Sequence, residues 1–326
     1  MKRIISLLIV LIIMASLICG CSLLPEDLKR CKVNFYVDGQ LYDSKTVTVG
    51  QTVRPPQAPE KKNEVFVAWE AEGLISYTFD FSRKVTGNID LHAHFVIDAI
   101  SLTNMITQHT MKSIVMIQNK CYNTMGGTAI ESNSNIFQGS GVVVDISGGY
   151  CYVLTNYHVV EMAEGYAKQS FSVEDPWGNT YDAQIYRKSS KTDYAMSDEY
   201  DLALLCFKYI PSNSNSLEEI TMGENPKAND YIVALGAPVG LQNAITYGSV
   251  LEYQQVNAGE DSSLQKIKFD VIVHNAPLDH GSSGGALLNT SGYLVGINFA
   301  GYNEGAYGCS IPISKVMEFM NLYVYQ

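Results

Sequence analysis

The stretch DHGSSGGALLN, residues 279–289, places two serines among glycines at the start of an apolar run. Alternating apolar residues predict a strand over 267–273, after which Pro277 and Gly281 bend the chain into a tight loop. A nucleophilic hydroxyl needs such a bend, because backbone N–H groups beside it must meet the oxyanion that forms on the attacked carbonyl. We therefore predict Ser283 as a nucleophile, with the N–H groups of Gly281 and Ser283 as oxyanion donors.

A general base is predicted at His158. In VLTNYHVV the histidine follows the end of a predicted strand, whose apolar part covers residues 151–154. A rigid sheet can hold an imidazole at such a strand end and still leave it within reach of a substrate.

A carboxylate at the mouth of a buried strand completes the set. In SDEYDLALLCF, Asp201 directly precedes the apolar run 202–207. Because burial of an unpaired charge costs several kcal/mol, Asp201 must have a hydrogen-bond donor as its partner. Asp193, Asp198 and Glu199 lie on a polar loop and have no such need.

Each of these three stretches also has a plainer interpretation when it is taken alone. His158 could be a rim or core residue, Asp201 could cap a turn, and GSSGG could be a polar turn that Ser282 shapes. The order His, Asp, Ser along an all-β chain favours the catalytic interpretation, because the chymotrypsin-like double barrel has this order. The α/β-hydrolases and subtilisins have different orders.

The elements that must position these residues are predicted to be mostly strands. From residue 111 onward, short alternating runs are separated by Gly, Asn, Asp and Ser turns. The last run has an apolar stripe at helical spacing, with Ser314 as the predicted N-cap. The stripe consists of Val316, Phe319, Met320 and Tyr323. We predict an all-β, chymotrypsin-like double β-barrel with a C-terminal helix over 111–326.

The motifs GSGVVVD, VLTNYHVV, DLALLCF, IVALGAPVGLQNAITYGSV, NAPLDHGSSGGALLNTSGYLVGINFAG and YGCSIPISKV occur in this order over residues 112–317. In these motifs the sequence resembles the trypsin-like serine proteases, in particular the HtrA/Deg-type branch. The resemblance implies peptide-bond hydrolysis without a metal or an organic cofactor. It gives His158 the role of base and then acid. Asp201 would fix the tautomer of His158, and Ser283 would form an acyl-enzyme.

Several positions depart from the pattern of that branch. Ser282 stands where the branch usually has Asn, and Phe299 stands where relatives commonly have a hydroxyl near the catalytic Asp. We therefore expect weaker support for Asp201 and slow turnover. Since the sequence stops at Gln326, we also expect no C-terminal PDZ domain of the kind typical of this branch.

The predicted substrate pocket is formed by the residues before Ser283 and by Phe299, Ala300 and Gly301, which should also pair with substrate as an added strand. Pro277 lies six residues before Ser283, where a trypsin-type enzyme would have an acidic selector. We therefore predict a small or medium apolar residue at P1 and no requirement for Lys or Arg.

Residues 32–96 form a separate β-rich module. Alternating Val33, Phe35 and Val37, a turn at 38–39 and a second alternation predict a hairpin. With FYVDG, VTVGQTV, FVAW and VTGNIDLHAHF, the module resembles the Listeria/Bacteroides repeat of internalin B type. The resemblance implies a small β-grasp-like fold on bacterial surface proteins and no chemistry, which leaves a surface ligand of the module open. His92 and His94 are interpreted as a solvated strand face, because no third metal ligand is visible. Residues 97–110 are predicted as a helical linker.

The N-terminus has the pattern of an export signal. Two cations precede an apolar run of 15 residues, Ile4–Ile18, which is shorter than the roughly 20 residues of a spanning helix. The sequence ICGC around Cys21 resembles the lipobox of bacterial lipoproteins. The resemblance implies a signal peptide over 1–20, a diacylglyceryl thioether on Cys21 and a tether over 21–31. We expect the protein on the outer face of a bacterial membrane, of Gram-positive type.

Charge and cysteine content narrow the classes of partner. The formal net charge of -11 on 326 residues would repel phosphates and argues against nucleic acid as a partner.

Cys151 and Cys206 lie in apolar runs and are interpreted as buried thiols. No cysteine or histidine spacing indicates a structural metal. Apart from Cys19 in the predicted signal and the predicted lipid site Cys21, five cysteines remain: Cys31, Cys121, Cys151, Cys206 and Cys309.

The sequence thus predicts a surface-anchored serine endopeptidase that acts on polypeptides, in particular exported or misfolded proteins. One alternative is a surface binding protein whose protease fold is catalytically weak or inactive. Another is a hydrolase of esters or cell-wall amides, which the same triad would support. The state of assembly stays open, since only the analogy with trimeric HtrA-type relatives favours an oligomer.

Overall fold

A computed structural model describes residues 29–71, 77–126, 128–189, 200–211, 215–237, 244–255, 267–302 and 307–323. The chain divides into two compact units, Met1–Ala99 and Ile100–Gln326. The predictions for the signal peptide, for Cys21 and for the polar loop with Asp193, Asp198 and Glu199 lie outside the described residues. Across the described ranges, no helix has both the length and the apolar character that crossing a membrane requires.

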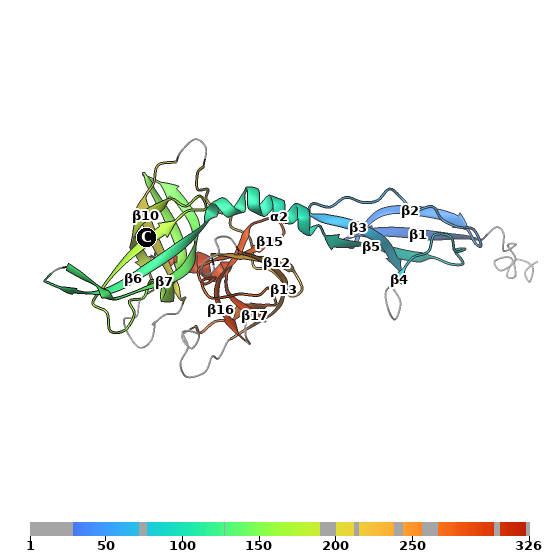
Figure 1. Ribbon diagram of the computed structural model, residues 1–326. Coiled ribbons are helices and arrows are strands. Elements are labelled where there is room, and N and C mark those ends of the chain that lie inside the picture. The colour runs from blue at the N-terminus through green and yellow to red at the C-terminus, as the bar shows by residue number, and fades with distance from the viewer. Residues whose placement is uncertain are drawn as a thin grey trace, which may run out of the picture. The chain divides into compact units, whose positions relative to one another are not determined.

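The first unit is a five-stranded sheet with the strand order β2-β1-β5-β3-β4 (Figure 1). The predicted hairpin is confirmed, because β1 and β2 pair antiparallel around Asp38 and Gly39. Both turn residues have positive φ, 49° and 76°, as a two-residue hairpin turn of the favoured twist requires. The strands are β1 (Arg30–Val37), β2 (Gln40–Thr48), β3 (Glu64–Ala71), β4 (Tyr77–Thr78) and β5 (Ile89–Ile97).

Aromatic residues form the centre of this sheet's core. The ring of Phe35 is fully buried and meets Trp69 edge to face at 4.9 Å between centroids. On β5, His92 stacks on a tyrosine ring, and His94 Nδ1 lies 3.2 Å from Glu70 Oε1. Among the residues described, no group of three or more His, Cys, Asp and Glu side chains could hold a metal ion.

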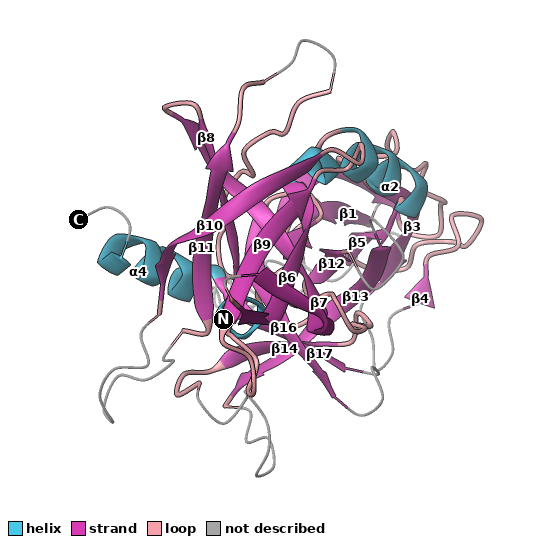
Figure 2. Ribbon diagram, turned by 60° about the vertical axis from the view of Figure 1, so that its left-hand side comes forward, coloured by secondary structure: helices cyan, strands magenta, loops and turns pink. Residues whose placement is uncertain are grey.

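The second unit contains two closed six-stranded barrels, which confirms the predicted double barrel (Figures 1 and 2). Around the first barrel the order is β10-β11-β8-β7-β6-β9, and around the second it is β12-β13-β14-β17-β16-β15. The strands of the first are β6 (Ile114–Met125), β7 (Thr128–Ser147), β8 (Tyr150–Asn156), β9 (Lys168–Glu174), β10 (Thr180–Lys188) and β11 (Leu202–Lys208). Those of the second are β12 (Tyr231–Gly236), β13 (Ala244–Gln254), β14 (Val271–His274), β15 (Ala286–Asn289), β16 (Leu294–Tyr302) and β17 (Tyr307–Pro312).

The strands β6 and β9 alternate between buried and more exposed residues, as the period of two predicts. In the first barrel, Leu205 and Phe207 of β11 pack with Val153 of β8 in one buried cluster. In the second, Ile232 of β12 packs with Ile272 of β14. The five cysteines that follow Cys21 in the sequence form no disulfide and are buried. The interpretation of Cys151 and Cys206 as buried thiols is therefore confirmed.

The predicted helix before the barrels is present as α2 (Ala99–Gln108). Its Leu102 and Ile106 are fully buried, and the hydroxyl of Thr103 is hydrogen-bonded to that of Tyr247 on β13. The helix therefore packs on the second barrel as part of that unit. A short 3₁₀ helix, Thr110–Ser113, leads into β6.

The C-terminal helix is confirmed as α4 (Ile313–Tyr323), with Val316, Phe319 and Met320 buried. The prediction of Ser314 as its N-cap is wrong, because Ser314 is already the second helical residue. Asn225 caps the helix instead: its Oδ1 accepts the N–H of Ser314 at 3.0 Å, and its Nδ2 donates to Ser314 Oγ at 2.8 Å.

Candidate active site

The structure brings together His158 and Asp201, two of the three predicted catalytic residues. His158 lies in the one-turn helix α3 (Tyr157–Val160), directly after β8. Its Nδ1 is 2.8 Å from Asp201 Oδ2, and its backbone N–H donates to Asp201 Oδ1 at 3.0 Å. The side chain of Asp201 is 5% exposed, so these two bonds give the buried carboxylate the partner that it requires.

Asp201 reaches this position through an unusual backbone conformation. Its φ is 47°, in the left-handed region that Asp tolerates better than most residues. The carbonyl of Asp201 accepts the N–H of Tyr157 at 3.0 Å and the side-chain amide of Asn156 at 3.1 Å. Because Asn156 is also the strand partner of Leu202, the β8–β11 pairing fixes both ends of the contact.

Two side-chain amides hold the segment that carries His158. Asn119 on β6 donates to Val159 O at 3.1 Å and to Glu161 O at 2.9 Å, and Gln169 on β9 donates to Val160 O at 3.2 Å. These bonds satisfy carbonyls that a one-turn helix leaves without partners. Sequence reasoning missed both residues. Asn119 is buried and Gln169 is half-buried, each as a polar residue within a strand.

Ser283 lies in the tight loop between β14 and β15. Gly281 and Gly284 on either side have φ of 93° and 83°, so the bend requires glycine at both. The Ser283 hydroxyl donates to Phe299 O at 3.2 Å. Transfer of its proton to an imidazole therefore requires the hydroxyl to leave this carbonyl. Phe299 itself is 3% exposed.

The N–H groups of this loop divide into two sets. Three of them are bonded within the protein: Ser282 to Asp279 O at 3.0 Å, Gly284 to Asn298 O at 2.8 Å and Gly285 to Ser282 O at 3.0 Å. Within the ranges that the structure covers, the N–H groups of Gly281 and Ser283 donate to no protein acceptor. These two were the predicted oxyanion donors.

The residues predicted for the substrate pocket lie on two neighbouring segments. Pro277 is exposed, and its carbonyl accepts the hydroxyl of Thr246 at 2.8 Å. On β16, Ala300 is half-buried and Gly301 is exposed. A Cβ at Gly301 would lie 3.2 Å from Leu278 O, so the end of β16 passes directly beside this segment. Sequence reasoning did not single out Leu278.

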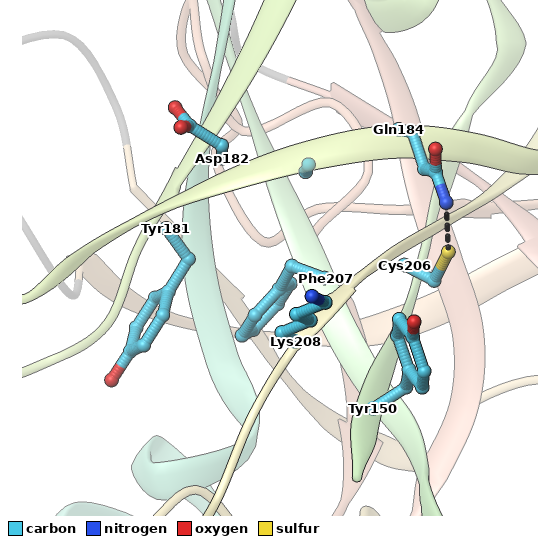
Figure 3. A pocket seen from close by; sticks show the side chains of 8 residues that line it. Tyr150, Tyr181, Asp182, Gln184, Cys206, Phe207 and Lys208 are labelled. Atoms are coloured by element: carbon cyan, nitrogen blue, oxygen red, sulfur yellow. Dashed lines mark hydrogen bonds between the residues drawn. The ribbon is translucent and has the colours of Figure 1, made fainter. Parts of the chain in front are cut away.

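A pocket of about 410 Å³ lies elsewhere, where β10 and β11 meet the start of β8 (Figure 3). The rings of Tyr181 and Phe207 form one wall, and Gln184 donates to Cys206 Sγ at 3.7 Å on the other side. None of the predicted site residues lines this pocket, so it is separate from the candidate active site.

A buried polar network lies behind the Ser283 loop. His274 Nε2 is 3.0 Å from Ser310 Oγ, which donates to Asn298 Oδ1 at 2.9 Å. Asn298 in turn bonds to both Gly284 and Gly285 through its backbone. Burial lowers the pKa of His274 to about 4, so the ring is neutral at pH 7. Sequence reasoning missed this histidine.

Comparison with known proteins finds similarity over the part of the chain that contains this site. Residues 139–297 match the model of the trypsin-like peptidase domain. This range contains His158, Asp201 and Ser283. Residues 32–94 match the model of the Listeria-Bacteroides repeat domain. The predicted resemblances to these two families are thus confirmed.

Several curated serine proteases are similar to this chain over 184 to 187 residues. Serine protease HTRA1 of Xenopus laevis is 34% identical over 184 residues, which are 56% of this chain and 35% of that protein. Putative serine protease HhoA of Synechocystis is 32% identical over 187 residues, 56% of this chain and 42% of HhoA. The probable periplasmic serine endoprotease DegP-like of Buchnera aphidicola is 31% identical over 185 residues, 55% and 34% of the two chains. The matched part spans about a third to two fifths of these relatives.

Proposed function

We propose that this protein is a serine endopeptidase that hydrolyses peptide bonds through His158, Asp201 and Ser283. The observation that supports this most directly is the Asp201 carboxylate, which accepts hydrogen bonds from both Nδ1 and the backbone N–H of His158. A buried carboxylate in this place holds the imidazole in the tautomer with Nδ1 protonated, so that Nε2 is the nitrogen that would accept a proton. The similarity to serine proteases agrees with this chemistry.

In the first half of the proposed reaction, Ser283 Oγ attacks the carbonyl carbon of the scissile bond and its proton passes to His158 Nε2. The carbonyl oxygen becomes an oxyanion between the N–H groups of Gly281 and Ser283. His158 then protonates the amine as the carbon–nitrogen bond breaks, and an ester to Ser283 remains. In the second half, His158 takes a proton from water, and the resulting attack releases the acid and regenerates the hydroxyl.

The substrate is proposed to be an extended polypeptide that pairs with residues 299–301 as an added strand. Because Pro277 supplies no charge to the pocket, a small or medium apolar P1 residue fits better than Lys or Arg. A peptide library measures this preference. Cleavage confined to bonds after Lys or Arg would contradict the proposed pocket.

The location is proposed to be extracytoplasmic, with a lipid on Cys21 anchoring the chain to the outer face of a bacterial membrane of Gram-positive type. The signal-like N-terminus supports this proposal, as does the similarity to a DegP-like protein whose name describes it as periplasmic. Exported or misfolded proteins would be the substrates there, and residues 32–96 would bind a surface ligand. The variant Cys21→Ala should shift the protein from the membrane fraction to the soluble fraction.

A second candidate function is that of a surface binding protein with little catalysis. The hydrogen bond from Ser283 Oγ to Phe299 O favours it, because the hydroxyl must give up this bond before its proton can be transferred. The contact between His158 and Asp201 argues for the endopeptidase, and slow turnover is compatible with both observations.

Digestion of an unfolded protein separates the two functions. The full chain is incubated with reduced, alkylated lactalbumin, and new termini are mapped by mass spectrometry, beside the matched variants Ser283→Ala and Ser282→Ala. We expect new termini with the wild type and with Ser282→Ala, and none with Ser283→Ala. The same termini with Ser283→Ala would show a contaminating protease, and none with any of the three would favour the binding protein.

A further inference from the structure

Two backbone N–H groups can bind one oxyanion only if the peptide between them is held in a fixed orientation. The donors are the N–H groups of Gly281 and Ser283, and the peptide that joins Gly281 to Ser282 lies between them. Rotation of that peptide would turn both donors. Its N–H is bonded to Asp279 O at 3.0 Å, so its carbonyl is the other point at which it can be held.

Ser140 holds that carbonyl. Its hydroxyl donates to Gly281 O at 2.6 Å, and its backbone N–H donates to Ser283 O at 2.8 Å. One residue of the first barrel thus binds two alternate carbonyls of the loop from the second barrel. Since the N–H and carbonyl of a trans peptide point in opposite directions, these bonds turn the carbonyls of the loop toward β7.

Strand pairing and hydrogen bonds hold Ser140 itself in place. It is fully buried in β7, where it pairs with Met116 of β6. Its hydroxyl accepts the N–H of Ala237, at the end of β12, at 2.8 Å, and its carbonyl accepts the hydroxyl of Thr155 at 2.7 Å. With its single proton given to Gly281 O, the hydroxyl has no freedom to rotate without loss of a bond.

Close packing adds to this constraint. A Cβ at Gly284 would overlap Ser140 O and Thr155 Oγ1, so the loop lies against β7 and β8 without space between them. At Gly139, a Cβ would lie 3.3 Å from Ser283 O. The strands β7 and β8 of the first barrel therefore restrict movement of the Ser283 loop, which belongs to the second barrel.

We propose that Ser140 is a positioning residue, whose hydroxyl orients the Gly281–Ser282 peptide so that the N–H groups of Gly281 and Ser283 converge on one oxyanion. This inference rests on the proposed function. Loss of the hydroxyl should weaken binding of the transition state and leave substrate binding unchanged, because only the transition state carries the full oxyanion. We expect kcat to fall about 10- to 100-fold with KM unchanged, less than the roughly 100- to 1,000-fold that removal of a donor costs.

The test compares Ser140→Ala with the wild type in the full chain. Steady-state kinetics on a peptide substrate gives kcat and KM, and the affinity of a peptide boronic acid reports the tetrahedral, oxyanion-bearing state. Tyr253→Phe is the matched control, because it removes a hydroxyl that donates to a backbone carbonyl, Pro226 O, at 2.6 Å in the second barrel, to which the Ser283 loop also belongs. We expect kcat and boronate affinity to fall together in Ser140→Ala and to stay unchanged in Tyr253→Phe.

Each other outcome decides against the proposal. Wild-type kcat and boronate affinity in Ser140→Ala would overturn the positioning role alone. A wild type that neither cleaves peptides nor binds the boronate would overturn the proposed function, and the positioning role with it. If Ser140→Ala does not fold, Ser140→Cys takes its place, because a thiol is a weak donor of nearly the same size. Its kcat must then fall with KM unchanged, and an unchanged kcat would overturn the proposal.

Discussion

The buried His274 makes the free energy of unfolding depend on pH. Its pKa in the folded protein is about 4, below its ordinary value of 6.5, because burial disfavours the charged ring. Between these two values the unfolded chain binds a proton that the folded chain does not. The neutral His274 therefore contributes fully to the free energy of unfolding above pH 6.5. This contribution is lost as the pH falls from 6.5 toward 4.

The magnitude follows from the same two values. Each pH unit in this interval changes the free energy of unfolding by about 1.4 kcal/mol. Between pH 7 and pH 5 the unfolded chain gains most of this proton, so the wild type should lose about 2 kcal/mol through His274 alone. The variant His274→Gln keeps a polar end for Ser310 and cannot take up the proton, so it should not show this loss.

Urea unfolding, followed by tryptophan fluorescence at pH 7 and at pH 5, measures the effect. Other titrating groups affect both proteins alike, so the relevant quantity is the difference between the two losses. We expect the wild type to lose about 2 kcal/mol more than His274→Gln. Equal losses in the two proteins would refute the reasoning, because His274 would then protonate as easily in the folded state as in the unfolded one.

Three further substitutions test single contacts. Asp201→Asn should lower kcat by about 10,000-fold on a peptide substrate, because the amide favours the imidazole tautomer that is not protonated at Nδ1. A loss below tenfold would contradict the role of Asp201. Gly284→Ala should lower the free energy of unfolding in urea by more than about 2 kcal/mol, because its Cβ overlaps Ser140 O. The control Gly178→Ala has a similar φ of 86° and open space around it, so it should cost only about 1 kcal/mol, and equal losses would contradict the overlap. Asn225→Ala removes the cap of α4 and should cost about 1 kcal/mol in thermal unfolding, and no change would show that the cap is dispensable.

The parts of the fold that were predicted correctly depend on local patterns. The hairpin at Asp38 and Gly39 has turn residues that tolerate positive φ, and the barrel strands β6 and β9 have a period of two. The N-cap of α4 was predicted wrongly because the capping residue, Asn225, lies 89 residues before Ser314. A local pattern cannot show a partner at that distance along the chain.

The same limit applies to the candidate site. His158, Asp201 and Ser283 could be selected because each lies in a motif whose residue types indicate chemistry. Ser140 and Asn119 could not, since both act through backbone carbonyls more than 35 residues away. A serine or an asparagine in a strand gives no sign of which distant carbonyl it will meet.

The most direct test of the central claim is covalent labelling of the nucleophile. The folded full chain is treated with a fluorophosphonate, which reacts with activated serines, and the intact mass is measured beside Ser283→Ala and Ser282→Ala. We predict one adduct per chain in the wild type and in Ser282→Ala, and none in Ser283→Ala. An adduct that persists in Ser283→Ala, or no adduct on the folded wild type at any pH from 6 to 9, would contradict the assignment of Ser283 as an activated nucleophile.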